Sequence, residues 1–308
     1  MSEPRLPHYV QYYALRGAVA ALDLVSMRRA GAIGARIGAL GYRPLGIRRA
    51  VVERQVRAAF PELPESEVLR IARASYAHLG RTSIEAALLS ARSPAQVRAM
   101  FEGVENVDVL DAARAEGKGI LFVTGHLGNW ELGGAFVAAS GVPLEAVARG
   151  MENPLFDRYI TRTRHDLGMR VIHDADAVRR VPRAMREGKG VAMLVDQGAA
   201  GLASTWVPFF GRYAKTPRGP AVFALRLGSP VVFATALRQP SGRYVMYYER
   251  VPVRPTGDRE ADVDRIVADY TSTLERWIRR APEQYFWHHR RWKHQRPGTP
   301  PELGDPSS

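Results

Sequence analysis

The stretch GILFVTGHLGNWELGG, residues 119–134, decides how the middle of this chain folds. Residues 119–124 form a short apolar run typical of a buried strand, and residues 130–139 have the apolar spacing of a helix. His126 and Glu131 therefore flank a turn from strand to helix. Gly125 and Gly128 give that turn backbone conformations that other residues avoid.

A histidine and a carboxylate at this spacing predict acid–base chemistry, provided that the turn brings them together. On one continuous helix, side chains five residues apart point about 140° from each other. The pair can meet only if His126 lies in the turn and Glu131 in the first helical turn. A neutral imidazole beside a carboxylate can take a proton from an alcohol near neutral pH. The open alternative is a histidine and a glutamate that only cap the helix.

Composition limits the classes of protein to which the chain can belong. The 308 residues are 46% hydrophobic, which is enough for one large domain or one domain with an extension. The absence of cysteine excludes disulfides, thiolate nucleophiles and cysteine-based zinc sites. A net charge of +13 predicts an anionic partner: nucleic acid, anionic lipid or an acidic protein.

The first 100 residues are expected to be helical and to associate with a membrane. Ten arginines against three acids in residues 1–60 suit an anionic bilayer, with a solvated face as the alternative. No run reaches 18 uninterrupted apolar residues, so the sequence shows no clear membrane span. The segment 17–27 is either a helix at the membrane interface or a plain core helix. The apolar stripe that continues through it consists of Leu15, Val19, Leu22, Val25 and Met27.

Strand and helix patterns alternate over residues 101–250. Strands are expected at 119–124, 144–148, 170–172, 190–195, 231–237 and 244–248, and helices at 130–139, 154–166, 176–186 and 262–280. This alternation predicts an α/β fold with a single, mostly parallel central sheet flanked by helices. We expect three regions: an N-terminal helical membrane-associating extension (1–100), an α/β core with a basic, aromatic C-terminal segment (101–296), and a disordered tail (297–308).

The basic segment 276–296 also bears on the partner. It contains seven basic residues, one acid and five interleaved aromatics, which suits a membrane interface or a single-stranded nucleic acid. The chain contains no recognised nucleic-acid motif, no phosphate loop, no H-E-x-x-H and no G-x-S-x-G. We therefore expect no nucleic-acid partner and no metal site; a basic nucleic-acid-binding protein is the alternative function that the charge leaves open.

The turn and several later segments resemble a known family. His126-Leu-Gly-Asn-Trp-Glu131 resembles the H-x4-D/E signature of the lysophospholipid acyltransferase superfamily, and more narrowly that of the bacterial lipid A late acyltransferases (lauroyl and myristoyl transferases). The likeness covers roughly residues 10–295 and departs from the family at Gly150, where relatives have proline. The further similar blocks, in order, are 147–154, 160–172, 196–197, 207–211, 214–217, 219–221, 282–287 and 289–293.

This resemblance implies a membrane-associated O-acyltransferase. His126 would take a proton from a hydroxyl of a lipid A precursor or similar glycolipid, and the oxygen would attack a fatty-acyl thioester without an acyl-enzyme. Glu131 would orient the imidazole. The donor would be acyl-carrier protein (acyl-ACP) or acyl-CoA, with no other cofactor. A lysophospholipid or a mannosyl lipid is an alternative acceptor. The resemblance places the protein at the cytoplasmic face of the bacterial inner membrane, either peripheral or with a single N-terminal anchor.

Seven further residues are candidates for substrate binding. They are Arg149, Asn153, Arg164, Asp196, Gln197, Lys215 and Thr216. The two arginines could bind a phosphate or the phosphopantetheine arm, and Arg149 also an oxyanion; the alternative is a local ion pair, for example with Glu152. Asp196 and Gln197 end a predicted strand, where open parallel sheets bind ligands. For Asn153 the alternative to substrate contact is a cap of the helix that begins at Pro154. Lys215 and Thr216 are candidates to contact an anionic group, with a plain surface lysine as the alternative.

Overall fold

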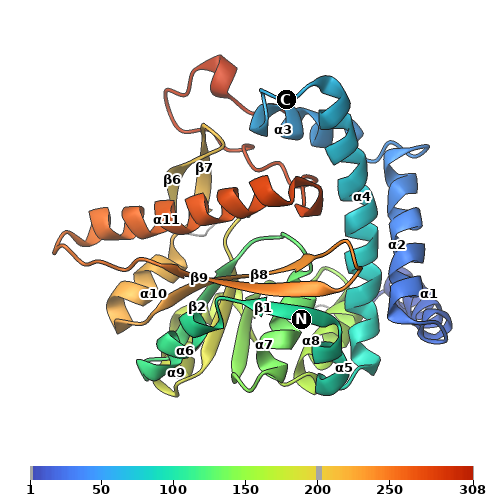
Figure 1. Cartoon of the computed structure of the whole chain (residues 1–308), viewed down its shortest axis with the longest axis horizontal. Coiled ribbons are helices and arrows are strands. Elements are labelled where there is room, and N and C mark those ends of the chain that lie inside the picture. The colour runs from blue at the N-terminus through green and yellow to red at the C-terminus, as the bar shows by residue number, and fades with distance from the viewer. Residues whose placement is uncertain (1–2, 199–202, 308) are drawn as a thin grey trace.

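A computed structural model describes residues 3–198 and 203–307, and its centre is a sheet of seven strands in the order β1-β9-β8-β2-β5-β3-β4 (Figure 1). The strands are β1 (Phe101–Glu105), β2 (Ile120–Thr124), β3 (Leu144–Ala148), β4 (Met169–His173), β5 (Gly190–Leu194), β8 (Val231–Arg238) and β9 (Tyr244–Val251). Every neighbouring pair is parallel except β8 and β9. The predicted mostly parallel α/β sheet is confirmed.

Helices cover both faces of the sheet, which explains why the β2 sequence is apolar throughout. The helices that follow β1 in the chain are α6 (Val107–Ala115), α7 (Trp130–Ala139), α8 (Pro154–Asp166), α9 (Ala177–Arg186), α10 (Gly219–Leu227) and α11 (Arg259–Arg280). Leu121 and Val123 point into the cluster beneath α9, α10 and α11, whereas Phe122 points into the cluster beneath α6 and α7.

The expected strands and helices agree with the observed ones to within a few residues, but helix α10 and three strands were missed. Edge strand β1 is largely exposed and carries two glutamates, so it lacks an apolar pattern. The other two are β6 (Ser204–Phe209) and β7 (Arg212–Pro217), which form a separate antiparallel hairpin. Its second strand, RYAKTP, is too polar to read as a strand.

Residues 3–100 are largely helical, as predicted. The helices are α1 (Leu6–Asp23), α2 (Met27–Tyr42), α3 (Arg49–Ala59), α4 (Glu65–Leu88) and α5 (Pro94–Ala99). Figure 1 shows α2 lying along α4 at one flank of the molecule. The two backbones touch at Gly38 and Gly80: a Cβ on Gly38 would lie 2.1 Å from the Tyr76 carbonyl oxygen. Only glycine permits this approach.

This helical region is built into the core rather than attached to it. Val52 of α3 and Ile71 of α4 belong to the same buried cluster as Leu121 of the sheet. In the segment 17–27, Val19 is buried in a cluster with Ala87 and Leu88, whereas Leu24 is 87% exposed, so this segment packs against α4 on one face only. Among the described residues, no helix is long and apolar enough to cross a membrane.

The C-terminal segment covers the carboxyl ends of the strands. After α11 and a 3-10 turn η3 (Pro282–Gln284), the chain runs back over the carboxyl ends of the strands. The stretch after Pro297, for which we expected disorder, carries a 3-10 turn η4 (Pro301–Leu303) in the structure. Arg212 donates to the Gly304 carbonyl, and Arg290 is ion-paired with Asp305. Two further 3-10 turns are η1 (Leu89–Ala91) and η2 (Asp174–Asp176).

Candidate active site

The turn between β2 and α7 has one conformation because several groups hold it. Asn129 is fully buried and caps α7, its Oδ1 accepting from the Leu132 N–H at 3.0 Å. Gly128 has a φ of 62°, and a Cβ there would lie 2.0 Å from the Ala236 carbonyl oxygen of β8. A side chain at position 128 would therefore push the turn away from the sheet.

Helix α4 holds the same turn at two points. The His78 Nε2 lies 3.0 Å from the Gly128 carbonyl oxygen, so it donates there. Two helical turns further along, Glu85 accepts from the Asn129 amide at 3.0 Å and from the Tyr244 hydroxyl at 2.5 Å. Burial lowers the pKa of His78 to about 4, which keeps that ring neutral. Burial also raises the pKa of Glu85, against the pull of its hydrogen bonds.

The C-terminal segment holds the opposite side of the turn. The Phe286 N–H donates to the His126 carbonyl, and the Gly128 N–H donates to the Gln284 carbonyl, each at 3.0 Å. Leu127 pairs with Tyr285 in an isolated β-bridge. The position of His126 thus depends on segments that are more than 150 residues apart in the sequence.

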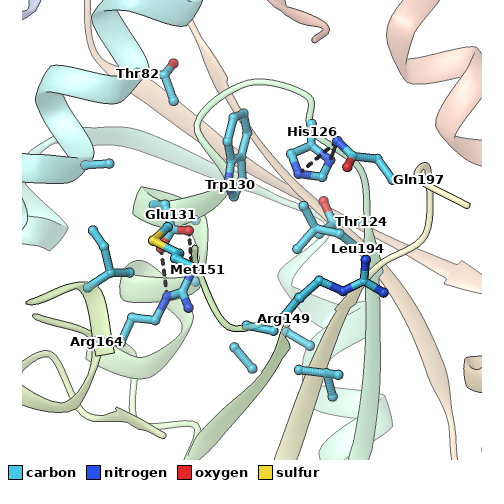
Figure 2. Close-up of a pocket in the computed structure, with 18 of the residues that line it drawn as sticks. Thr82, Thr124, His126, Trp130, Glu131, Arg149, Met151, Arg164, Leu194 and Gln197 are labelled. Atoms are coloured by element: carbon cyan, nitrogen blue, oxygen red, sulfur yellow. Dashed lines mark hydrogen bonds and ion pairs between the residues drawn. The ribbon is translucent and has the colours of Figure 1, made fainter. Parts of the chain in front are cut away.

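The carboxylate that binds the imidazole is Asp196, not Glu131. The His126 Nδ1 lies 2.8 Å from Asp196 Oδ1, and the His126 backbone N–H donates to Asp196 Oδ2 at 2.9 Å. Asp196 is only 2% exposed. The Gln197 amide nitrogen lies 3.2 Å from His126 Nδ1 and 3.4 Å from Nε2 (Figure 2). The expected contact of His126 with Glu131 is thus replaced by one with a residue 70 positions away.

This pairing sets the protonation of both groups. Burial opposes a charged imidazole, but the Asp196 carboxylate outweighs it, and Glu131 adds a smaller effect, so the pKa of His126 is raised above 6.5. Burial alone would raise the pKa of Asp196; the His126 ring and N–H, with Arg291, lower it to about 2. Asp196 is therefore an ionised acceptor that holds the Nδ1–H tautomer and leaves Nε2 as the base.

Glu131 binds a different cation. Its two oxygens accept from Arg164 of α8 at 2.6 and 3.1 Å, a bidentate ion pair. In Figure 2 the Trp130 ring lies between this pair and His126. The physical reason is the helix geometry: α7 begins at Trp130, so Glu131 projects sideways toward α8 rather than back toward the turn.

The site lies at the carboxyl ends of three adjacent strands. His126 follows β2, Asp196 follows β5 and Arg149 follows β3, and these strands are neighbours in the sheet. This edge is where open parallel sheets bind ligands. The strand-end argument that marked Asp196 and Gln197 in the sequence is consistent with their position here.

A cavity of about 1120 Å³ opens at this edge and continues between the sheet and α7. Its inner wall is apolar: Phe122, Val137, Leu144, Met169, Ala192 and Met246. Its polar lining includes His126, Glu131, Arg149, Arg164, Gln197 and Lys215. The volume exceeds that of typical pockets for drug-sized ligands, about 300–1,000 Å³. An elongated apolar group can therefore enter with its polar end at His126.

The other candidates are not all at the cavity. Arg149 is 60% exposed and pairs with Asp174 at 3.1 Å, rather than with Glu152. Asn153 is buried as the cap of α8 and donates to the His8 carbonyl and Gln11 of α1, so its visible role is structural. Thr216 is fully buried and accepts from Arg291 at 2.5 Å. Neither Asn153 nor Thr216 is among the residues that line the cavity.

Sequence reasoning did not single out Arg291 and His289. Arg291 is 5% exposed, donates to the Lys215 carbonyl at 2.7 Å and lies close enough to Asp196 to help keep it ionised. His289 lines the cavity, and burial lowers its pKa to about 4. Both residues lie in the block 289–293, whose similarity to the family was the one sequence feature that could have identified them. Within the described residues, no group of three or more His, Asp or Glu could hold a metal ion.

Comparison with known proteins finds similarity to acyltransferases in each case reported below. The family model described as "Bacterial lipid A biosynthesis acyltransferase" matches residues 2–294. The chain is 27% identical to the lipid A biosynthesis palmitoleoyltransferase of Escherichia coli K12 over 264 residues, covering 85% of this chain and 84% of that one. It is 27% identical to the lipid A biosynthesis lauroyltransferase of the same organism over 272 residues (87% and 86%). Over 200 residues it is 24% identical to a phosphatidylinositol mannoside acyltransferase of Mycolicibacterium smegmatis (64% and 64%).

Proposed function

Because the chain belongs to the bacterial lipid A biosynthesis acyltransferase family and is an acyl-transferring enzyme, we propose that it moves a fatty acyl group from a thioester to a hydroxyl of a lipid A precursor. The observation that carries this proposal is the His126–Asp196 pair at the mouth of an apolar cavity. The donor is acyl-ACP or acyl-CoA, and no further cofactor takes part.

The reaction follows from the protonation of the pair. His126 Nε2 takes the proton of the acceptor hydroxyl as its oxygen attacks the thioester carbonyl carbon. Asp196 stabilises the imidazolium that forms. The tetrahedral intermediate collapses, the carbon–sulfur bond breaks, and the imidazolium returns the proton to the departing thiolate. No acyl-enzyme forms, and His126 ends neutral.

The oxyanion of the intermediate needs donors next to His126. The Gln197 amide nitrogen lies 3.4 Å from His126 Nε2, and Arg149 lines the same cavity. We assign the oxyanion to these two donors. One such donor is typically worth about 10²–10³ in kcat.

The acyl chain occupies the apolar inner part of the cavity. Phe122, Ala192 and Leu144 lie on three adjacent strands and face the same space beside α7. Burial of apolar surface stabilises bound methylenes by about 0.8 kcal/mol each. The strands run toward His126, so a chain lying along them places its thioester at the base.

The exposed face of α1 suits peripheral attachment to a membrane. Leu6, Val10 and Tyr13 lie on one helical face and are 77%, 63% and 66% exposed. Arg5 and Arg16 flank this face, as expected for an anionic lipid surface. We place the protein at the cytoplasmic face of the inner membrane. Changing these three residues to Gln is expected to reduce sedimentation with anionic vesicles; unchanged sedimentation contradicts this attachment.

The function is tested with purified protein, an acyl thioester and a lipid A precursor. Mass analysis is expected to show an acceptor heavier by one acyl group, and none with His126→Ala. The likeness to a phosphatidylinositol mannoside acyltransferase supports a mannosyl lipid as second acceptor, to be assayed in parallel. Failure to acylate either glycolipid, with a folded protein and an intact thioester, contradicts the proposal.

A further inference from the structure

The mouth of the cavity is cationic on the side of β7 and the C-terminal segment. Lys215, Arg290, Arg291 and Lys293 all line it. The carboxylates among the lining residues are Glu131 and Asp174, and both are already occupied. Glu131 binds Arg164, and Asp174 binds Arg149. The lining therefore carries an excess of positive charge.

That excess resides on two lysines. Arg290 is ion-paired with Asp305, and the buried Arg291 lies beside Asp196. Lys215 and Lys293 have no ion pair to any carboxylate within residues 3–198 and 203–307. The chain has only four lysines, and these two line the same cavity. Ammonium groups left without a carboxylate at a site are suited to bind an anion.

The two lysines lie on the far side of the base from the apolar wall. Phe122 lies in the middle of β2, whereas His126 lies in the turn after that strand, so the apolar wall lies back along β2 from the base. Lys215 lies at the other side: its carbonyl contacts Arg291 and approaches Gly198, the residue after Gln197. Lys293 is exposed and follows Arg291 by two residues. The order is thus apolar wall, imidazole, ammonium groups.

We propose that Lys215 and Lys293 form a subsite for a phosphate ester of a substrate. The inference rests on the proposed function, because it places the acyl chain on the apolar wall and the reacting carbonyl at His126. Lysine binds phosphate as a compact point charge with three donors. The phosphate belongs either to the phosphopantetheine arm of the donor or to a phosphorylated acceptor. Both present the same anionic group, and the experiment below separates them.

The test compares matched substrates that differ only in the phosphate. The donors are S-acyl-4′-phosphopantetheine and S-acyl-pantetheine with the same acyl chain; the acceptors are a phosphorylated glycolipid and its dephosphorylated form. The ratio of kcat/KM, phosphorylated over unphosphorylated, is measured for wild type and for Lys215→Ala/Lys293→Ala. Lys118→Ala, which changes an exposed lysine outside the cavity, is the matched control.

The double variant is expected to lower one of the two ratios about 10- to 100-fold, the effect of losing charge-assisted bonds to phosphate. A fall with the donor pair assigns the subsite to the phosphopantetheine arm, and a fall with the acceptor pair assigns it to the acceptor phosphate. Lys215→Arg/Lys293→Arg should restore the ratio in part. Both ratios unchanged, or equal losses with Lys118→Ala, overturn the subsite. Absence of any transfer by the wild type would instead overturn the proposed function.

Discussion

Two side-chain pairs of the site start from residues only five positions apart and yet do different things. His126 reaches Asp196 at the end of the neighbouring strand β5, whereas Glu131 reaches Arg164 on α8. The first pair sets the tautomer and pKa of a base; the second joins two helices along the cavity wall. Strand order and helix direction, rather than closeness in sequence, determine which residue each side chain contacts.

The largest loss of activity is expected for His126→Ala, which removes the base from the first pair. Positioned general-base catalysis contributes about 10²–10⁴-fold, so kcat should fall by about that factor. The melting temperature should fall modestly, because the buried Asp196 loses the imidazole and keeps the His126 backbone N–H. Steady-state rates and thermal melts check this, with His165→Ala, an exposed histidine of α8, as the control. Near-normal turnover of the alanine variant would show that His126 is not the general base.

Gly128→Ala should break both pairs at once, because Gly128 lies between them. The added methyl group meets the Ala236 carbonyl at 2.0 Å and strains a positive φ, which should cost about 2–6 kcal/mol of unfolding free energy. Chemical denaturation measures it. Gly117→Ala is the matched control, since its φ is 67° but no atom lies within 4 Å of the added Cβ. Equal losses for both variants would mean that backbone strain, not the contact with β8, fixes the turn.

Asp196→Asn should separate the two pairs by harming only the first. The amide oxygen can still accept the His126 N–H, but the side chain no longer holds the Nδ1–H tautomer. We expect kcat to fall about 100-fold or more, in line with losses of about 10⁴ for the corresponding change in a serine protease. Single-turnover rates at saturating donor measure the effect. A variant as active as wild type would show that the aspartate only fills space.

Glu131→Gln is expected to have the smaller effect of the two carboxylate changes. It leaves Arg164 largely buried without its partner, which should lower stability and reduce kcat about 10-fold, or 1.4 kcal/mol. A double-mutant cycle of Glu131→Gln and Arg164→Gln, measured on the free energy of unfolding, should show a coupling energy of about 0.5–3 kcal/mol. Arg162→Gln, in an exposed ion pair on the same helix, is the control. A cycle with no coupling would mean that the bidentate pair contributes nothing.

The sequence predicted the layers of the fold and marked His126, Asp196 and Gln197 as candidates, but it did not predict how they pair. Alternation of apolar runs located β2, β5 and α7 to within a residue or two, because those elements are buried on defined faces. Asp196 and Gln197 were marked by their place at a strand end. Their contact with His126 depends on β2 lying beside β5, and strand order leaves no trace in local periodicity. Arg291 was missed for the same reason, since its contacts span 75 residues or more.

The account depends most on Asp196, rather than Glu131, setting the pKa of the base. The decisive measurement is the pH dependence of kcat/KM for wild type, Asp196→Asn and Glu131→Gln. The base must be neutral to act, so the wild-type rate should fall as pH drops through a midpoint above 6.5. Removing the Asp196 charge should move that midpoint to lower pH, and removing the Glu131 charge should move it much less. A larger shift with Glu131→Gln, or none with Asp196→Asn, would contradict the account.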